Sequence, residues 1–337
     1  MRAVGLYQYL PIEHPESLVD VELPAPEPGP RDLRVAVRAV SVNPVDVKVR
    51  APKPDRETAP RILGWDAAGV VDAVGRDVHL FKPGDQVFYA GSIARPGTNA
   101  ELHLVDERIV GRKPKKLSFA QAAALPLTSL TAWELLFDRF EIPRGIATSD
   151  ALLIIGAAGG VGSIATQLAR RLTGLTVIGT ASREESAEWV RSMGAHAIVD
   201  HRQPLAAQVK AINAAGARYV AGLTATDQHF EAVADLIAPE GKFGLIDDPR
   251  KPLDIRVLKR KSASIHWEFM FTRALFETAE PMAQHRILNH IAELVEAGTI
   301  RTTFTHDMGV INAENLRKAH AAIESGTTIG KLVLSGF

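Results

Sequence analysis

The segment "ALLIIG", residues 151–156, leads through a glycine cluster, "GAAGGVG", directly into a helical pattern, "VGSIATQLARRLT". An apolar strand, a tight turn and a helix in this order are typical of the first unit of a doubly wound parallel sheet. The alternation continues to about residue 270, and a run of amphipathic helices without a sheet would not give such regular apolar segments bounded by glycine. We therefore predict an α/β unit with a parallel sheet of six strands. Its other strands are expected in "TVIGTA", "AIVDH", "YVAGL", "KFGLID" and "SIHWEF".

The first part of the chain follows a different pattern. Short β-like runs, "LRVAVRAVSV", "AAGVVDAVG" and "DQVFYAG", are separated by proline and glycine turns at irregular spacing, which favours a mostly β, barrel-like domain. Two helical patterns and an apolar ending follow residue 270 and are too few to form a domain, so we expect them to complete the first one. A chain of 337 residues is long enough for two domains. We place one at residues 1–125, completed by 271–337, and the other at 126–270.

Composition excludes several kinds of chemistry. The chain has no cysteine, so disulfides, thiolate zinc sites, iron–sulfur clusters and cysteine nucleophiles are ruled out. Lys+Arg and Asp+Glu are equal at 39 each, so no overall charge favours nucleic acid or a membrane surface. No apolar run approaches the roughly 18 residues of a membrane span, and the N-terminus lacks the apolar core of a signal peptide. We expect a cytoplasmic protein that acts on a small molecule.

The glycine cluster predicts a dinucleotide site. The fingerprint G-x-G-x-x-G is present as Ala157-x-Gly159-x-x-Gly162, with alanine in place of the first glycine. Gly159 would let the backbone approach a pyrophosphate, and Gly162 would let the helix pack on the strand. The helix that begins near Val161 would then point its N–H groups and positive dipole end at the phosphates. The position after a strand and before a helix makes this interpretation stronger than an ordinary tight turn.

The end of the second strand predicts which dinucleotide binds. An acidic residue there would accept hydrogen bonds from the ribose of NAD, but the chain has Thr180 and Ala181, followed by Ser182 and Arg183. A hydroxyl and a guanidinium suit a 2′-phosphate, so we predict NADP(H). In the alternative interpretation Arg183 opens the next helix on a solvated face, and an acid of "REES" (Glu184 or Glu185) binds the ribose.

Several further segments carry a family resemblance. They are "SVNPVDVKVR", "ILGWDAAGVVDAVG", "FKPGDQVFYAG", "AAALPLTSLTAWELL", "GAAGGVG" and "GKLVLSGF". In order and spacing the chain resembles the medium-chain dehydrogenase/reductase superfamily over essentially its whole length. It is most similar to the zinc-free quinone oxidoreductase branch and to the bacterial proteins called zinc-type alcohol dehydrogenase-like, for which "SIHWEFMFTRALFET" is typical. The resemblance implies a GroES-like domain and a Rossmann domain.

The resemblance also implies that zinc is absent. Zinc-dependent members have cysteine where this chain has Asn43, a His-Glu pair where it has Trp65 and Asp66, and a second cysteine near Leu127. Asparagine and tryptophan do not make a zinc site, and Asp66 alone cannot supply the three protein ligands of a catalytic zinc. The four cysteines of the structural zinc lobe have no counterpart either. We expect no metal ion.

The resemblance places the site residues in a cleft between the domains. Asn43 and Asp46 would line the cleft, Thr131 would lie under the nicotinamide, and Lys331 would approach it from the other domain. For Asn43 and Asp46 a turn cap before Pro44 is an equally good interpretation. Trp65, Trp133, Tyr89, Phe269 and Phe271 would either wall an apolar pocket or pack in the core. The residues expected to contact the cofactor are Ala158, Gly159, Gly160, Val161, Gly162, Ser182, Arg183, His201, Leu245, Ile246, Phe269, Phe271 and Lys331.

These features predict an NADPH-dependent oxidoreductase that transfers hydride to a quinone or an α,β-unsaturated carbonyl without a metal. Three alternatives remain: an alcohol or aldehyde dehydrogenase of the same superfamily, a sensor that binds NADP(H) without turnover, and an RNA-binding or lens-type role. Neutral charge and the lack of a basic stripe with interleaved aromatic residues disfavour RNA binding. By fold analogy we expect a homodimer, because in this superfamily the strand near "SASIHWEF" often pairs with its copy.

Overall fold

The chain divides into two units in the computed structural model, which describes residues 1–337. The first unit comprises Met1–Leu130 and Phe271–Phe337, and the second comprises Thr131–Met270. The sequence-based boundary between residues 125 and 126 falls at the start of helix α3 (Pro126–Trp133), whereas the structural division falls within that helix. No helix of the chain combines the length and the apolar character that crossing a membrane demands.

The second unit is built on a six-stranded sheet in the order β11-β10-β9-β12-β13-β14. All neighbouring strands are parallel, so the predicted doubly wound sheet is confirmed. The strands are β9 (Ala147–Ile155), β10 (Gly174–Thr180), β11 (Ala197–Val199), β12 (Ala217–Gly222), β13 (Ile237–Leu245) and β14 (Ser264–Trp267). The helical segments are η2 (Glu134–Arg139), α4 (Gly160–Leu172), α5 (Glu184–Ser192), α6 (Leu205–Ile212), α7 (Thr226–Leu236) and η3 (Ile255–Lys261).

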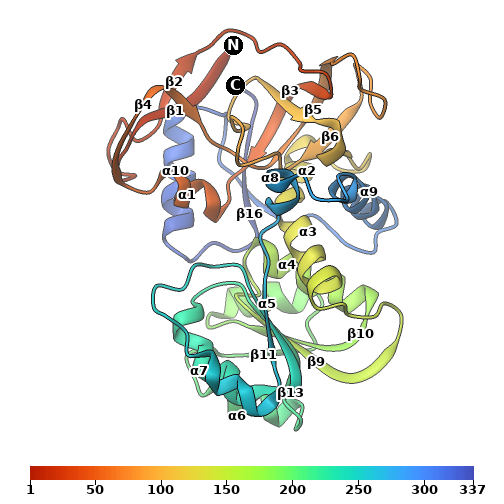
Figure 1. The fold of residues 1–337 in the computed structure, drawn as a ribbon. Coiled ribbons are helices and arrows are strands. Elements are labelled where there is room, and N and C mark those ends of the chain that lie inside the picture. The colour runs from red at the N-terminus through yellow and green to blue at the C-terminus, as the bar shows by residue number, and fades with distance from the viewer. The chain divides into compact units, whose positions relative to one another are not determined.

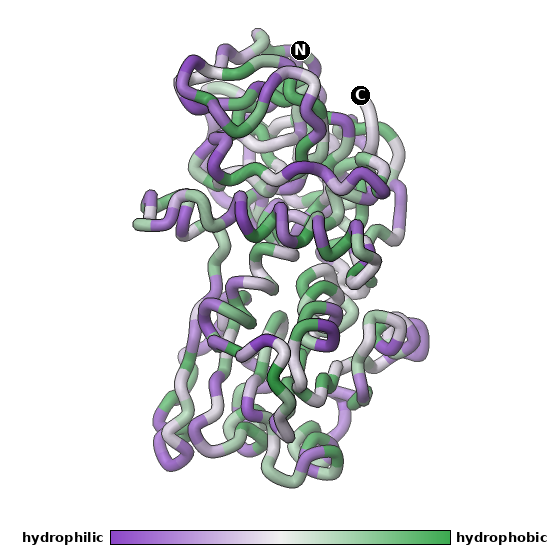
Figure 2. The backbone as a smooth tube through the Cα atoms, turned by 90° about the vertical axis from the view of Figure 1, so that its right-hand side faces the viewer, coloured by the Kyte–Doolittle hydropathy of each residue, from purple (hydrophilic) through white to green (hydrophobic).

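Apolar residues explain why these segments form strands and helices around one core. Residues 151–155 of β9, the central strand, are all buried, as a parallel strand covered on both faces requires. Helix α4 buries Ile164 and Leu168 and exposes Arg170 and Arg171 in its last turn, where cations oppose the negative end of the helix dipole. Helices α6 and α7 lie side by side (Figure 1). In each unit hydrophobic and hydrophilic residues alternate along the chain (Figure 2).

The first unit contains two sheets. A three-stranded sheet has the order β2-β1-β4, and a seven-stranded sheet has the order β15-β16-β3-β5-β6-β8, with β7 paired to β3. The last strand, β16 (Lys331–Ser335), runs antiparallel to β3 (Asp32–Ser41) with Val333 opposite Ser41. The two termini lie close together in this unit (Figure 1). The other strands are β1 (Arg2–Tyr9), β2 (Val19–Glu22), β4 (Lys53–Ile62), β5 (Ala67–Val74), β6 (Gln86–Tyr89), β7 (Leu102–Asp106), β8 (Gly111–Arg112) and β15 (Phe304–Asp307).

The helices of the first unit come from both ends of the chain. Helices α9 (Ala283–Glu296) and α10 (Ala313–Glu324) occupy the two helical patterns seen after residue 270. Strand β15 and helix α8 (Thr272–Phe276) were not expected, because each is a single short element without a clear apolar period. The remaining helices are α1 (Pro44–Arg50), η1 (Glu107–Ile109) and α2 (Phe119–Ala123).

A buried pair of carboxyl groups connects η2 to the end of β14 in the second unit. Glu134 is 0% and Glu268 is 2% exposed. Arg139 Nε lies 2.9 Å from Glu268 Oε2, and Arg139 Nη2 lies 3.6 Å from Glu134 Oε2. Burial, followed by repulsion from Glu134, raises the pKa of Glu268 above its ordinary value of 4.5. Since one guanidinium cannot neutralise two buried carboxylates, the pair retains a proton at neutral pH.

We expect Glu268→Gln to stabilise the protein at alkaline pH and to change its stability little near pH 5. A carboxyl whose pKa is raised by folding favours the folded state below its ordinary pKa of 4.5, and this contribution is lost as pH rises through the raised value. Glutamine keeps the shape but cannot ionise. Thermal unfolding measured from about pH 5 to about pH 9 gives the free energy of unfolding of both proteins. The value for the variant should rise relative to wild type by up to about 1.4 kcal/mol per pH unit.

The control for this measurement is Glu231→Gln, which changes an exposed glutamate of α7. Its stability relative to wild type should not depend on pH. A difference between Glu268→Gln and wild type that is the same at every pH would contradict a shared proton.

Candidate cofactor site and buried ion cluster

The glycine turn follows the central strand of the second unit. Gly156 directly follows β9 and has a positive φ of +82°, a conformation that glycine adopts without strain. Its backbone N–H donates to Thr180 Oγ1 at the end of β10, at 3.0 Å. The turn leads to Gly159, which is the N-cap of α4 with φ −72° and ψ 178°. The strand–turn–helix geometry expected from "GAAGGVG" is therefore present.

The structure gives different reasons for the glycines at 159 and 162. A Cβ added to Gly162 would lie 2.4 Å from the backbone oxygen of Gly156 and 2.6 Å from Ala157 Cα, so only glycine fits where α4 crosses the turn. A Cβ added to Gly159 would lie 3.6 Å from its nearest neighbour, Gly156 O, which is an ordinary contact. Packing within the protein thus explains Gly162 and leaves Gly159 unexplained.

The N-terminus of α4 suits an anion. Gly159 provides no side-chain cap, and residues 158–161 are partly exposed, so N–H groups of the first turn face outward with the positive end of the helix dipole. Ser163 Oγ donates to Gly159 O at 2.7 Å and accepts from Trp189 Nε1 at 2.8 Å. These two hydrogen bonds connect the turn at Gly159 to helix α5. These residues fit the pyrophosphate of a dinucleotide, and the assignment of Ala158–Gly162 to the cofactor stays a prediction.

The end of β10 carries the residues predicted to select NADP(H). Thr180 is buried, Ser182 is half-buried and Arg183 is exposed as the N-cap of α5. Glu184, one of the two acids that would serve a ribose in the alternative interpretation, forms an ion pair with Arg191 at 3.1 Å.

The neighbouring strand β11 ends beside β10, since Ala181 N donates to Val199 O at 3.0 Å. Asp200 there is bound by the Arg202 side chain, with Nη2 2.8 Å from Oδ2, and hydrogen bonds from Arg202 lower its pKa to about 2. The His201 ring lies 5.9 Å from the ring of His229. Asp200, the acid that directly follows β11, is therefore already paired with a cation of its own.

A second group of predicted residues meets in the first unit, around Lys331. This lysine begins β16 and is 3% exposed. Its Nζ lies 3.1 Å from Asp66 Oδ2, donates to Val42 O at 2.9 Å, and also donates to Asn43 Oδ1. Burial lowers the pKa of Lys331, and Asp66 opposes that effect. The three hydrogens of the ammonium group thus have three protein acceptors.

Asp66 joins three segments of the first unit. Its Oδ2 accepts from Asn43 Nδ2 at 2.8 Å, and its Oδ1 accepts from the backbone N–H of Leu127 at 2.8 Å. Leu127 lies in the first turn of α3, where an anion is favoured by the helix dipole. Asp66 is completely buried, and burial raises its pKa while Lys331 lowers it.

Asp46 is the other acid of this cluster. It lies in the first turn of α1, and its Oδ2 accepts from the backbone N–H of Asn43 at 2.6 Å, so Asn43 and Asp46 do form the turn cap considered from the sequence. Asp46 is 1% exposed, and burial raises its pKa to about 7. Oδ2 is occupied by the Asn43 N–H, whereas Oδ1 of Asp46 has no hydrogen-bond partner within the protein.

The aromatic and apolar residues predicted for the site are divided between the units. In the first unit the rings of Trp65 and Phe271 meet edge to face at 6.2 Å, and Tyr89 OH pairs with His103 Nδ1 at 3.1 Å. The other predicted residues of this kind are in the second unit: Thr131, Trp133 and Leu245 are buried there, Ile246 is half-buried, and Phe269 is 46% exposed. Trp65, Phe271 and Tyr89 thus pack in the core of the first unit.

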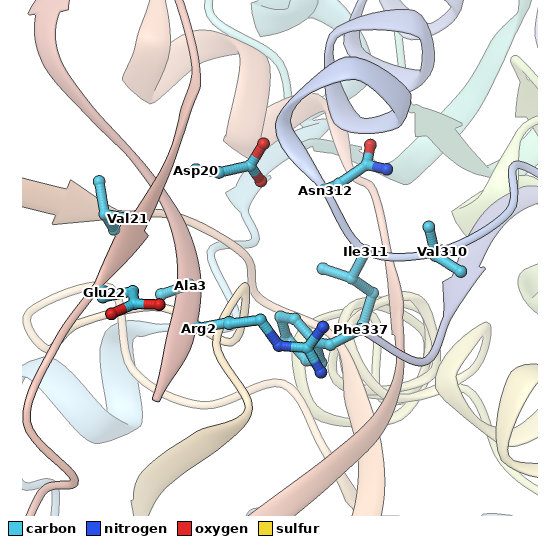
Figure 3. A pocket seen from close by; sticks show the side chains of 9 residues that line it. All are labelled: Arg2, Ala3, Asp20, Val21, Glu22, Val310, Ile311, Asn312 and Phe337. Carbon is cyan, nitrogen blue, oxygen red and sulfur yellow. The ribbon is translucent and has the colours of Figure 1, made fainter.

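A cavity of about 400 Å³ in the first unit lies beside the two termini and is distinct from these clusters. Figure 3 shows that Arg2 and Phe337 lie next to each other there, and the guanidinium is 6.0 Å from the ring centre. Arg2 is paired with Glu101, and Asp20 accepts from the backbone N–H of Ala313. None of the residues predicted for the cofactor or for catalysis lines this cavity.

Residues at the positions of zinc ligands do not fit zinc. Both oxygens of Asp66 are engaged, the Trp65 indole N–H donates to Ser92 O at 3.2 Å, and Leu127 contributes only its backbone N–H. No three residues among His, Cys, Asp and Glu gather anywhere in the chain in a way that would hold a metal ion. Four ligands of nitrogen, sulfur or carboxylate oxygen are what zinc ordinarily requires.

Sequence reasoning missed how these residues combine. It placed Lys331 at the nicotinamide and treated Asp66 as the remnant of a ligand pair, without joining the two. The available signal was an acid before the apolar strand "AAGVV" and a lysine before the apolar strand "LVL", both of which folding buries. The pair of Glu134 and Glu268 was not predicted, although each acid is a single charge within an apolar segment, "TAWELLF" and "HWEFMF".

The comparisons with known proteins cover both units. A model of the alcohol dehydrogenase GroES-like domain matches residues 29–126, and a model named zinc-binding dehydrogenase matches residues 193–334. A zinc-type alcohol dehydrogenase-like protein of Staphylococcus aureus is 41% identical over 99% of this chain and 100% of its own length. A quinone oxidoreductase of Pseudomonas aeruginosa is 31% identical over 95% of this chain and 96% of its own length.

Solved structures give the same result. A Rhizobium etli protein classed with zinc-dependent alcohol dehydrogenases is 56% identical, with a TM-score of 0.95 over 100% of this chain and 98% of that one. The Escherichia coli quinone oxidoreductase in complex with NADPH has a TM-score of 0.84 at 26% identity, over 99% of this chain and 100% of that one. With both domain models and relatives of full length in agreement, the chain belongs to the medium-chain dehydrogenase/reductase superfamily.

Proposed function

We propose that this oxidoreductase uses NADPH to reduce quinones or α,β-unsaturated carbonyls without a metal ion. The observation that carries the proposal is the ion cluster of the first unit, which consists of Asn43, Asp46, Asp66 and Lys331. At the positions of the zinc ligands the chain has an amide, an indole and a carboxylate, and the carboxylate is paired with the Lys331 ammonium group. The similarity to quinone oxidoreductases of two bacteria supports the same assignment.

The choice of acceptor follows from charge. Hydride addition to a simple aldehyde concentrates negative charge on one oxygen, which a Lewis acid stabilises by several kcal/mol. The donor set around Asp66 does not fit such an ion. A quinone or enone spreads the charge through conjugation, so hydrogen bonds from the protein suffice.

We assign the cofactor to the second unit. Gly159 and the first turn of α4 would hold the pyrophosphate, and Ser182 with Arg183 would hold the 2′-phosphate. Glu184 is paired with Arg191 and Asp200 with Arg202, so neither of these acids is left as a free carboxylate to repel that phosphate. NADPH, when bound, supplies the hydride. The remaining predicted contacts belong to the same proposal: His201, Leu245, Ile246 and Phe269 from this unit, and Phe271 and Lys331 from the first unit.

Asn43, Asp46 and Thr131 are proposed to serve the reacting end of the cofactor and the acceptor. Asn43 would act by holding its neighbours, because its amide hydrogens already face Asp66 Oδ2 at 2.8 Å and Ser41 O at 3.3 Å. Asp46 would hold a proton near neutral pH, since burial raises its pKa to about 7.

We expect wild type to bind NADPH more tightly than NADH and Arg183→Ala to abolish this preference. Losing one charge-assisted hydrogen bond costs about 1.5–3 kcal/mol, so NADPH should bind roughly 10- to 150-fold more weakly while NADH is unaffected. Gly159→Ala should weaken both cofactors with normal thermal stability, because its Cβ meets no protein atom closer than 3.6 Å. Fluorescence titration of both cofactors measures this.

The control for the cofactor titration is Arg171→Ala, which removes an exposed arginine at the other end of α4. It should leave both affinities unchanged. If wild type binds NADH more tightly than NADPH, Glu184 or Glu185 serves the ribose and the assignment of Arg183 is wrong.

With NADPH we expect oxidation of the cofactor in the presence of quinones or enones and little or no oxidation of simple alcohols with NADP⁺. The reason is the absence of suitable metal ligands around Asp66, as argued above. The loss of NADPH absorbance across a small panel of acceptors, with ethanol plus NADP⁺ as the reverse reaction, is the measurement. Robust alcohol oxidation together with inert quinones and enones would instead place the chain among the alcohol dehydrogenases of the superfamily. Binding of NADPH without turnover of any acceptor would favour a sensor.

We also infer a homodimer formed through β14. This strand ends the sheet of the second unit, so its outer backbone groups have no partner strand within the chain. Trp267 on β14 is 57% exposed and Phe269 just after it is 46% exposed. Sedimentation at micromolar concentration should give twice the mass of 36.4 kDa, and Trp267→Lys should shift the protein toward monomer. A wild-type monomer would contradict the inference.

A further inference from the structure

The ion cluster of the first unit has the organisation of a metal centre but contains an amine instead. Lys331 Nζ is surrounded by three oxygens, from the Val42 carbonyl, the Asn43 amide and the Asp66 carboxylate. A lysine with 3% exposure and an aspartate with 0% exposure are rarely buried together unless each compensates the other.

The ion pair also connects the segments that carry zinc ligands in zinc-dependent relatives. Lys331 contacts Asn43 directly, and it contacts Asp66, which reaches Asn43 and the backbone N–H of Leu127. Trp65 is held beside this group by its own hydrogen bond to Ser92 and its contact with Phe271. One cation is therefore joined directly to positions 43 and 66 and, through Asp66, to position 127.

Such a cluster disagrees with the zinc in the names of the matching family model and of the relatives. A divalent cation would need Asp66 as a ligand, but the ammonium lies 3.1 Å from Oδ2 and repels a second cation at that distance. Both oxygens of Asp66 also accept hydrogen bonds, Oδ1 from the Leu127 backbone N–H and Oδ2 from the Asn43 amide, and a metal ion bound there would have to compete with these donors.

We propose that the Lys331 ammonium is a built-in cation that stands in place of a metal ion, linking Asn43 to Asp66 and denying Asp66 to divalent cations. Lys331 is therefore a positioning residue, because it holds Asn43 and Asp66 in place. The proposal concerns only contacts within the first unit, so it does not depend on NADPH or on quinones, and it shares with the proposed function only the exclusion of a metal ion.

The linking role is tested by a double-mutant cycle of wild type, Lys331→Met, Asp66→Asn and the double variant, each unfolded in denaturant near pH 5 and near pH 8. Lys331→Met leaves a buried carboxylate without its cation, so the unfolding equilibrium constant should rise roughly 10²- to 10³-fold near pH 8. The loss should be smaller near pH 5. Without the ammonium, the pKa values of Asp66 and Asp46 in the folded protein rise further. A carboxyl whose pKa is raised by folding favours the folded state at low pH, and this contribution is lost as pH increases.

Adding Asp66→Asn to Lys331→Met should recover most of the lost stability near pH 8, because it removes the unpaired charge. The matched control is Lys318→Met with Glu314→Gln, an exposed pair on α10 at 2.7 Å, for which coupling should be close to zero. A loss that is equal at both pH values and simply additive with Asp66→Asn would show that Lys331 only fills space, and would overturn the proposal.

The exclusion of divalent cations is tested on the purified wild-type protein after incubation with zinc and removal of free metal. Elemental analysis should find no stoichiometric zinc, and a chelator should leave the unfolding curve unchanged. About one zinc per chain that resists a chelator would overturn the proposal. The outcome is independent of catalysis, so a protein inactive with quinones would contradict the proposed function without touching this inference.

Discussion

The pairing of the last strand with β3 is the contact on which the first unit depends. Leu334 lies opposite Val40 and Val333 opposite Ser41, and Ser41 Oγ adds a hydrogen bond to Leu332 O at 2.8 Å. This register delivers the first residue of β16, Lys331, to the loop that holds Asn43. Because side chains alternate along a strand, a slip by one residue would turn the lysine to the opposite face and leave Asp66 buried without a cation.

Much of the fold follows from local pattern. The inner strands of the second unit contain short apolar runs bounded by glycine or polar residues, as parallel strands covered on both faces do, whereas the edge strand β14, "SIHW", does not. In the first unit only the longer strands show a pattern of this kind. Strand β15 has four residues, "FTHD", whose pairing with β16 depends on long-range contacts and not on their own propensity.

The candidate site divides in the same way. The turn at Gly156–Gly162 is a local feature, and sequence spacing was enough to place it. The ion cluster is not a local feature, because the segments that supply its residues and the Leu127 backbone N–H that Asp66 binds are distant in sequence. No local sequence pattern around Asn43, Asp66 or Lys331 predicts that they meet. Family resemblance directed attention to three of these positions as lost ligands. It did not indicate that a lysine from the last strand would compensate the carboxylate among them.

The place of Lys331 in the chain has a consequence for the order in which the units fold during synthesis. The second unit is one continuous segment, Thr131–Met270, and all of its strands have been made when that segment is complete. The first unit needs β16, which is made after the whole of the second unit, and until then the Lys331 ammonium group is not available to Asp66 and Asp46. A partly synthesised chain that lacks β16 can therefore carry a complete second unit and an incomplete first one, in which two acids must stay protonated or stay in water.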